Sequence, residues 1–145
     1  MTVTQRTLDW HPHYDARSRK YAIRTLLKQR SVENKRKMWE EGVVLDQGSE
    51  GACVGFAWTG ELLAQPQAPE KQPSFKYGNE LARSFYLEAQ KIDEWPGENY
   101  SGTSVLAGAK IMQQRGFIGE YRCCFNLNDI KESVISEGPV VFGTP

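Results

Sequence analysis

The chain has 145 residues, of which 39% are hydrophobic and 25% are charged, and its 18 basic residues balance its 18 acidic ones. A net charge of zero argues against a dominant role in binding nucleic acid or an anionic membrane. The sequence contains no run of about 18 apolar residues, so it predicts no transmembrane helix. Met1–Arg6 lacks the apolar core of a secretion signal. We therefore expect a protein of one compact core that has neither nucleic acid nor a membrane as its partner.

The cysteine content bears on the compartment. Three cysteines are present, Cys53 and the adjacent pair Cys123 and Cys124, and an odd number argues against a disulfide framework. The two histidines, His11 and His13, lie far from any cysteine, so their spacing fits no zinc pattern. We expect a cytoplasmic protein with no metal and no cofactor, in which the His-Pro-His pair is exposed to solvent.

Residues 1–42 read as a polar N-terminal arm followed by a charged linker. The first 20 residues are polar and predict an extended arm. Tyr21–Leu27 fits either a short strand or one helical turn, because seven residues do not separate the two patterns. The stretch from Lys28 to Lys37 mixes charges of both signs, which indicates a solvated loop or helix face.

A glycine-rich loop then leads into a helix. Gly48 and Gly51 permit backbone angles that other residues resist, and a helical period begins near Cys53 and ends before Pro66. Cys53 is therefore expected at a helix N-terminus, where unpaired N–H groups favour a thiolate over a thiol. The side-chain amide of Gln47, six residues earlier, is positioned to form an oxyanion hole with the backbone N–H of Cys53.

The residues from Gln47 to Cys53 resemble the nucleophile motif of papain-like cysteine peptidases, which reads Gln-Gly-x-Cys-Gly-x-Cys followed by an aromatic residue. The resemblance implies that Cys53 is the nucleophile and Gln47 the oxyanion-hole glutamine. It also implies that residues 43 and 44 approach the site as an extended segment packed beside it. Two positions depart from the motif: Glu50 stands where the family has a disulfide cysteine, and Val54 where it has tryptophan.

Two more helices are predicted downstream. After a proline-rich loop at 65–75, residues 79–91 form an amphipathic pattern. Residues 103–115 form the next helix, which Ser101 or Thr103 caps and Gly116 ends. The step at Gly102 resembles the Gly-Gly turn that forms a wall of the substrate cleft in the papain-like family. The resemblance implies that Gly102, Ser101 and Gly51 contact substrate; a helix-capping glycine is the alternative for Gly102.

The last predicted elements are a helix over 129–136, capped by Asn126 or Asn128, then Gly138-Pro139 and a buried strand at Val140–Phe142. This order matches the point where the family's second domain begins. The fold class expected is therefore α+β: mainly the helical left domain of the papain-like fold, with the first strand of its β-rich right domain. The domain boundaries that follow are 1–42, 43–138 and 139–145.

The implied function is hydrolysis of peptide bonds through a thioester. Such chemistry needs a histidine base, and the family carries its histidine and asparagine in the β-rich domain, downstream of the last strand predicted here. Neither His11 nor His13 occupies a position that the family uses. The alternatives are a truncated enzyme with little turnover of its own, a non-catalytic module that binds a peptide or protein, and a half-enzyme completed by another chain or by a homo-oligomer.

Overall fold

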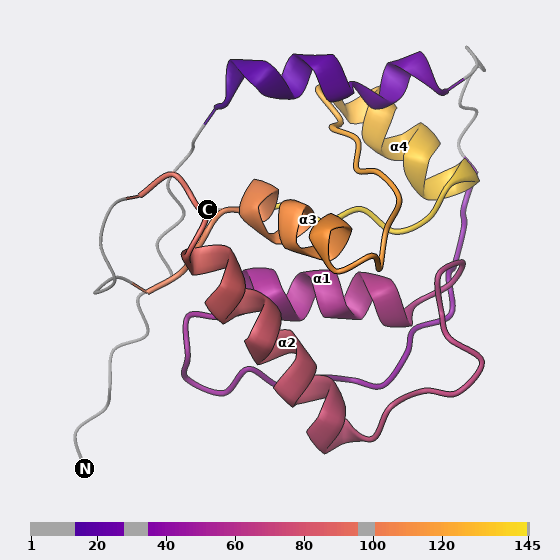
Figure 1. Cartoon of the computed structure of the whole chain (residues 1–145). Coiled ribbons are helices and arrows are strands. Elements are labelled where there is room, and N and C mark those ends of the chain that lie inside the picture. The colour runs from indigo at the N-terminus through magenta and orange to yellow at the C-terminus, as the bar shows by residue number, and fades with distance from the viewer. Residues whose placement is uncertain (1–13, 28–34, 96–100, 145) are drawn as a thin grey trace.

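The computed structural model describes residues 14–27, 35–95 and 101–144. The helical elements of these residues follow one another along the chain as η1 (Ala16–Tyr21), η2 (Ile23–Thr25), α1 (Cys53–Leu63), α2 (Phe75–Gln90), α3 (Val105–Gln114) and α4 (Leu127–Ser136). Figure 1 shows α1 at the centre, with α2 and α3 packed on it and with α4 and η1 at the opposite side of the molecule. None of the described helices is long and apolar enough to cross a membrane.

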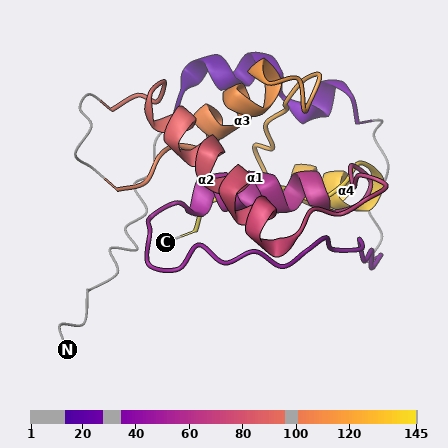
Figure 2. The same cartoon turned by 60° about the horizontal axis from the view of Figure 1, so that its bottom comes forward.

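Two glycines let the helices pack closely on α1. A Cβ on Gly55 would overlap the Ala82 carbonyl oxygen of α2, and one on Gly108 of α3 would lie 2.6 Å from Nε1 of Trp58. The same indole nitrogen donates a hydrogen bond to the Val105 carbonyl oxygen at 3.0 Å. Figure 2 shows the crossing of α1 and α2 from another side. Because Cβ atoms are absent at both contacts, the backbones of the three helices can approach one another directly.

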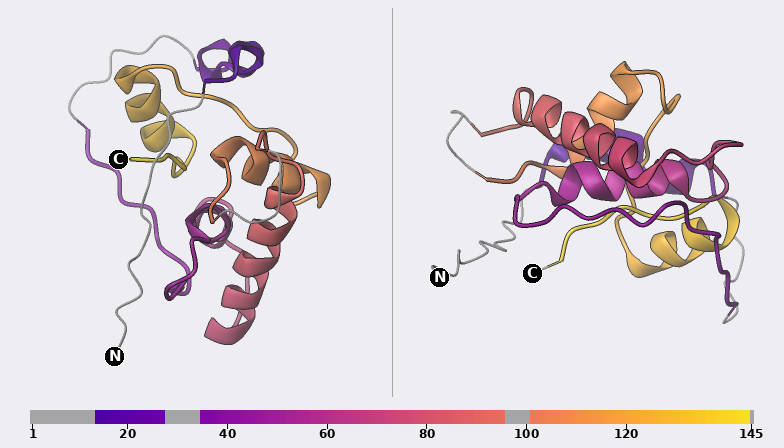
Figure 3. Two further views of the ribbon diagram at one scale, coloured as in Figure 1. Left: turned by 90° about the vertical axis from the view of Figure 1, so that its left-hand side faces the viewer. Right: turned by 90° about the horizontal axis from the view of Figure 1, so that it is seen from below.

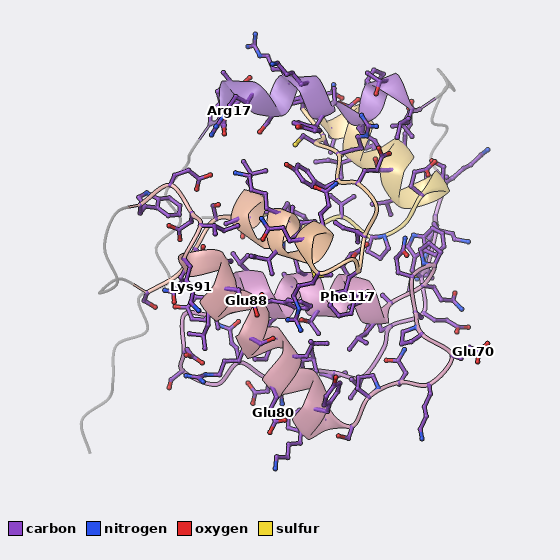
Figure 4. The ribbon with its side chains drawn as sticks, in the orientation of Figure 1. Arg17, Glu70, Glu80, Glu88, Lys91 and Phe117 are labelled. Atoms are coloured by element: carbon purple, nitrogen blue, oxygen red, sulfur yellow. The ribbon has the colours of Figure 1, made fainter. Side chains whose placement is uncertain are left out.

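The buried core lies between α2 and α3. Its members are apolar residues from those two helices, namely Phe85, Ala89, Ala107, Ile111 and Met112. Phe117, which follows α3, sets its ring edge-on to Phe85 with 5.4 Å between centroids, and the guanidinium of Arg115 lies over both rings. Figure 4 labels Phe117 beside the end of α3. Arg115 also forms an ion pair with Glu88 of α2 at 3.8 Å. Its guanidinium therefore covers this end of the core and connects the end of α3 to α2.

The N-terminal segment docks on the opposite side, against α4. The N–H of Ile23 donates to the Cys123 carbonyl oxygen at 3.0 Å, and the N–H of Cys123 donates to the Tyr21 carbonyl oxygen at 2.8 Å. Arg24 forms ion pairs with Asp129 and with Glu132 of α4. The left view of Figure 3 shows η1 end-on, at the same end of the molecule as α4.

These contacts correct the predicted arm. The expectation of an extended arm is wrong for residues 16–20, which form η1 because the Asp15 carboxylate caps its first turn by accepting the Arg17 N–H at 2.9 Å. Tyr21–Leu27 combines a 3₁₀ turn with one isolated bridge between Ala22 and Cys123. Residues 1–13, with His11 and His13, and residues 28–34 of the charged linker lie outside the described residues.

The predicted helices exist, and their N-termini differ in detail. The start of α1 at Cys53 is confirmed. Helix α2 begins at Phe75 instead of residue 79, because Ser74 caps it and accepts the Tyr77 N–H. Helix α3 is capped by Ser104, and neither Ser101 nor Thr103 does so. Of the two caps predicted for α4, Asn126 is the correct one.

The prediction that Gly116 ends α3 is confirmed. Gly116 has φ +74°, and its N–H donates to the Gln113 carbonyl oxygen. The next N–H, of Phe117, donates to the Met112 carbonyl oxygen. This pair of bonds is a Schellman motif, which needs a left-handed residue at the position of Gly116.

The α+β assignment is wrong. Among the described residues no β-strand is present, and the one bridge between Ala22 and Cys123 is isolated. Val140–Phe142, which the apolar run predicts as a buried strand, belongs to no sheet. Valine and phenylalanine favour extended backbone, but a strand also requires a second backbone to pair with, and no described segment supplies one. The described part of the chain is helical.

Candidate functional site

The loop before Cys53 is fixed at several points. The carboxylate of Asp46 accepts the N–H of Gly48 at 2.8 Å, and Gly48 takes φ +62°, which glycine adopts without strain. The Asp46 N–H donates to the side chain of Asn79 on α2 at 3.0 Å. These bonds hold the loop against the first half of α2 before it turns into α1.

A second tie comes from Glu50. Its carboxylate pairs with the Arg83 guanidinium of α2, with Nε 2.9 Å from Oε2. In the resemblance to papain-like peptidases, Glu50 stands at the position of a disulfide cysteine. In this chain an ion pair connects the loop to α2 at that position, and both of its side chains remain partly exposed.

Cys53 is the first residue of α1 and its side chain is exposed. Ala52 precedes it at the N-cap and offers no side-chain acceptor to the first-turn N–H groups. A helix start without a capping side chain leaves its N–H groups to water or to a ligand. The thiol therefore stands at the surface, at the positive end of the central helix.

Gln47 is half-buried, and its amide nitrogen donates to the Glu50 carbonyl oxygen at 3.0 Å. An amide NH₂ carries two hydrogens, so one remains for another acceptor. The bond holds the side chain over its own loop. Glu50 thus acts twice here, through its carbonyl on Gln47 and through its carboxylate on Arg83.

The three residues expected to contact substrate are brought together. A Cβ on Gly51 would overlap the Ser101 hydroxyl oxygen and would lie 3.4 Å from the Gly102 nitrogen. Gly102 has φ +103°, so glycine is required for this backbone and not merely preferred at a helix start. The turn before α3 therefore packs on the residue two before Cys53, although the two segments are about fifty positions apart.

The backbone of Gly102 already has partners. Its N–H donates to the Tyr86 hydroxyl at 3.2 Å, and its carbonyl oxygen accepts from the Gln90 amide at 3.2 Å. Both partners lie on α2. A peptide that pairs with Gly102, as the family resemblance implies, has to exchange these two bonds.

Three residues that hold the site were not identified from the sequence. The sequence pattern does not distinguish Tyr86 from an ordinary aromatic residue of the core. It also does not predict which group its hydroxyl binds. Arg83 lies 33 positions from Glu50, so no local charge pattern links them. Trp58 lies 47 positions from Val105, and its indole N–H holds the first turn of α3 by donating to the Val105 carbonyl oxygen.

The other cysteines have different surroundings. Cys123 is partly buried, and this burial raises the pKa of its thiol, although a hydrogen bond with Ser18 opposes the rise. The sulfur of Cys124 lies 3.6 Å from the Ser133 hydroxyl. Within residues 14–27, 35–95 and 101–144 no three His, Cys, Asp or Glu side chains are grouped so that they could hold a metal ion.

Comparison of the chain with profiles of protein families, with curated proteins and with solved structures finds no match.

Proposed function

We propose that this chain carries the nucleophile half of a papain-like cysteine peptidase. The observation that supports it is the exposed Cys53 thiol at the uncapped start of α1. The loop bearing Gln47 precedes it, and the turn at Gly102 packs against that loop through Gly51. The spacing from Gln47 to Cys53, which resembles the family's nucleophile motif, adds to this geometry.

In the proposed reaction the Cys53 sulfur attacks the carbonyl carbon of a peptide bond. The amine leaves with a proton, and water then hydrolyses the thioester and restores the thiol. The second amide hydrogen of Gln47 and the Cys53 N–H would hold the oxyanion. The proton transfers need a histidine, which we assign to a segment outside these 145 residues or to another chain, so we expect little turnover from this chain alone.

The first test compares one cysteine in two states. Cys53 is alkylated with iodoacetamide at pH 6, in the folded protein and in urea, and the modified peptides are quantified by mass spectrometry. We expect the folded protein to react at least about threefold faster, because an activated nucleophile at a helix N-terminus reacts faster than a cysteine of the unfolded chain. Cys123 and Cys124 in the same sample should react more slowly when folded than in urea. A slower reaction of folded Cys53 would rule out an activated nucleophile.

The second test addresses Gln47. A peptide aldehyde adds reversibly to a thiolate, and the oxygen of the adduct occupies the position of the oxyanion. Gln47→Ala should weaken this adduct by about tenfold, the value of one good hydrogen bond. Gln67→Ala is the matched control, because Gln67 is exposed on the loop after α1. Equal adduct stability in both variants would remove Gln47 from the oxyanion hole.

A second candidate function is a non-catalytic module that binds a peptide or protein. The bonds from Gly102 to Tyr86 and Gln90 favour the absence of catalysis, because they occupy the backbone groups that a peptidase would offer to its substrate. This reading predicts that folded Cys53 reacts no faster than the denatured chain and that no aldehyde adduct forms.

A further inference from the structure

A groove of about 400 Å³ runs along one face of α1. Its floor is the stripe Ala57, Gly60, Glu61 and Ala64, and the segment after α4 forms a wall with Val140, Val141 and Phe142. Ala57 lies one turn after Cys53, so the groove begins close to the thiol. Neither α2 nor α3 covers this face, because both pack on α1 through Gly55 and Gly108.

The groove contains a half-buried acid that has an unpaired oxygen atom. Oε2 of Glu61 is buried and forms no hydrogen bond, and burial raises the pKa of this carboxyl group. Glu41 is a second acid in the lining, and no lysine or arginine side chain lines the groove. The ammonium of Lys37 lies 4.3 Å from the centroid of the Trp39 ring, and Trp39 also lines the groove. An apolar groove with a buried unpaired carboxylate is complementary to a cation on an apolar stem.

The wall of the groove also presents free backbone. Among the described residues, none of the backbone N–H or C=O groups of residues 139–144 forms a hydrogen bond with another backbone group. The side chains here are those that favour strands, and Phe142 is 65% exposed. An extended segment with such an edge is a template for a second strand.

We propose that this groove binds an extended polypeptide segment that carries one lysine or arginine. Its backbone pairs with the edge at Val140–Phe142, its apolar side chains cover the α1 stripe, and its cation meets Glu61. The proposal goes beyond the peptidase assignment and does not depend on it, because none of its residues takes part in the thiol chemistry.

The probe is a nine-residue peptide, acetylated and amidated, in which valine and threonine alternate around a central lysine. A second peptide replaces the lysine by norleucine, and a third carries N-methyl groups on alternate residues. Binding to the full chain is measured by isothermal titration. We expect the lysine peptide to bind saturably and the other two to bind at least about tenfold more weakly.

Variants of the chain locate the site. Glu61→Gln should weaken the lysine peptide by about tenfold or more, and Ala57→Arg should abolish its binding by placing a guanidinium beside Glu61 at the i+4 position. Glu70→Gln is the matched control, since Glu70 is exposed on the outer loop between α1 and α2 (Figure 4). Circular dichroism checks that each variant is folded. No binding of the lysine peptide, equal binding of the norleucine peptide, or equal losses in Glu61→Gln and Glu70→Gln would overturn the proposal.

Discussion

Gly51 and Ser101 lie so close that a methyl group on Gly51 would overlap the Ser101 hydroxyl oxygen. Gly51 belongs to the loop that ends at Cys53, and Ser101 to the turn that opens α3. Their contact joins two segments that the sequence places far apart. It also makes Gly51 a position where glycine is needed for space, since Gly51 does not adopt the positive φ that would itself favour glycine.

Gly51→Ala should therefore destabilise the fold. The added methyl group has to displace the Ser101 side chain, and forced contacts of this kind cost about 1–3 kcal/mol. The free energy of unfolding from urea titration measures the effect. Ser101→Gly removes the hydroxyl that is in the way, so the double variant should recover most of the loss.

Gly60→Ala is the control for Gly51→Ala. A Cβ on Gly60 meets no atom within 4 Å, and alanine is a better helix former than glycine. This variant should be more stable by up to about 1 kcal/mol. Similar losses in both variants would show that the Gly51–Ser101 contact is not as tight as described.

The local parts of the fold could be predicted from the sequence. Asn126 and Gly116 mark helix ends because capping and left-handed glycines depend on neighbouring residues only. The start of α1 at Cys53 follows from the same kind of signal. The residues that determine these helix ends lie within one or two helical turns of them in the sequence.

The tertiary parts could not be predicted. Val140–Phe142 has the composition of a strand but does not form one. Strand formation depends on hydrogen bonds to a second, distant backbone as well as on the residues of the segment itself. The tie between Glu50 and Arg83 and the bonds of Gly102 to α2 also join distant residues. The candidate site residues Gln47, Gly51, Ser101 and Gly102 are proposed from a resemblance to the papain-like motif, and the sequence does not predict their contacts.

Tyr86→Phe tests whether the hydrogen bond from the Gly102 N–H to the Tyr86 hydroxyl holds the turn before α3. Without the Tyr86 hydroxyl the Gly102 N–H loses its acceptor, so its amide should exchange with deuterium several times faster, and stability should fall by about 1 kcal/mol. Hydrogen exchange read by mass spectrometry over the turn before α3 measures it. Tyr77→Phe, at an exposed position of the same helix, should leave the exchange unchanged. Unchanged exchange in Tyr86→Phe would mean that the bond does not hold the turn.

Asp129 predicts how the fold responds to acid. Burial alone would raise the pKa of this carboxyl group, but the Phe125 N–H and Arg24 outweigh burial, and the pKa is lowered. The folded state therefore favours the carboxylate. Its contribution is fully present above the ordinary value of 3.8 and is lost as pH falls through the folded-state pKa.

Asp129→Asn should lower stability at pH 7 by about 2 kcal/mol, because the buried side chain loses charge-assisted bonds to Arg24 and Phe125. The difference from the parent protein should shrink as pH is lowered from 5 to about 2. Urea titrations at each pH measure it, with the exposed Glu137→Gln as the control. A difference that stays constant with pH would show that Asp129 does not titrate with folding.

Glu61 predicts the opposite dependence. Burial raises the pKa of its carboxyl group above the ordinary value of 4.5, so the folded state favours the protonated form and loses stability as pH rises through that raised pKa. Glu61→Gln stays neutral and should be more stable than the parent by roughly 1 kcal/mol at pH 7, with no advantage below pH 4.5. Thermal unfolding across this range measures the effect, and Glu70→Gln should follow the parent at every pH. A Glu61→Gln protein that is less stable at pH 7 would mean that the carboxylate has a cationic partner within the chain.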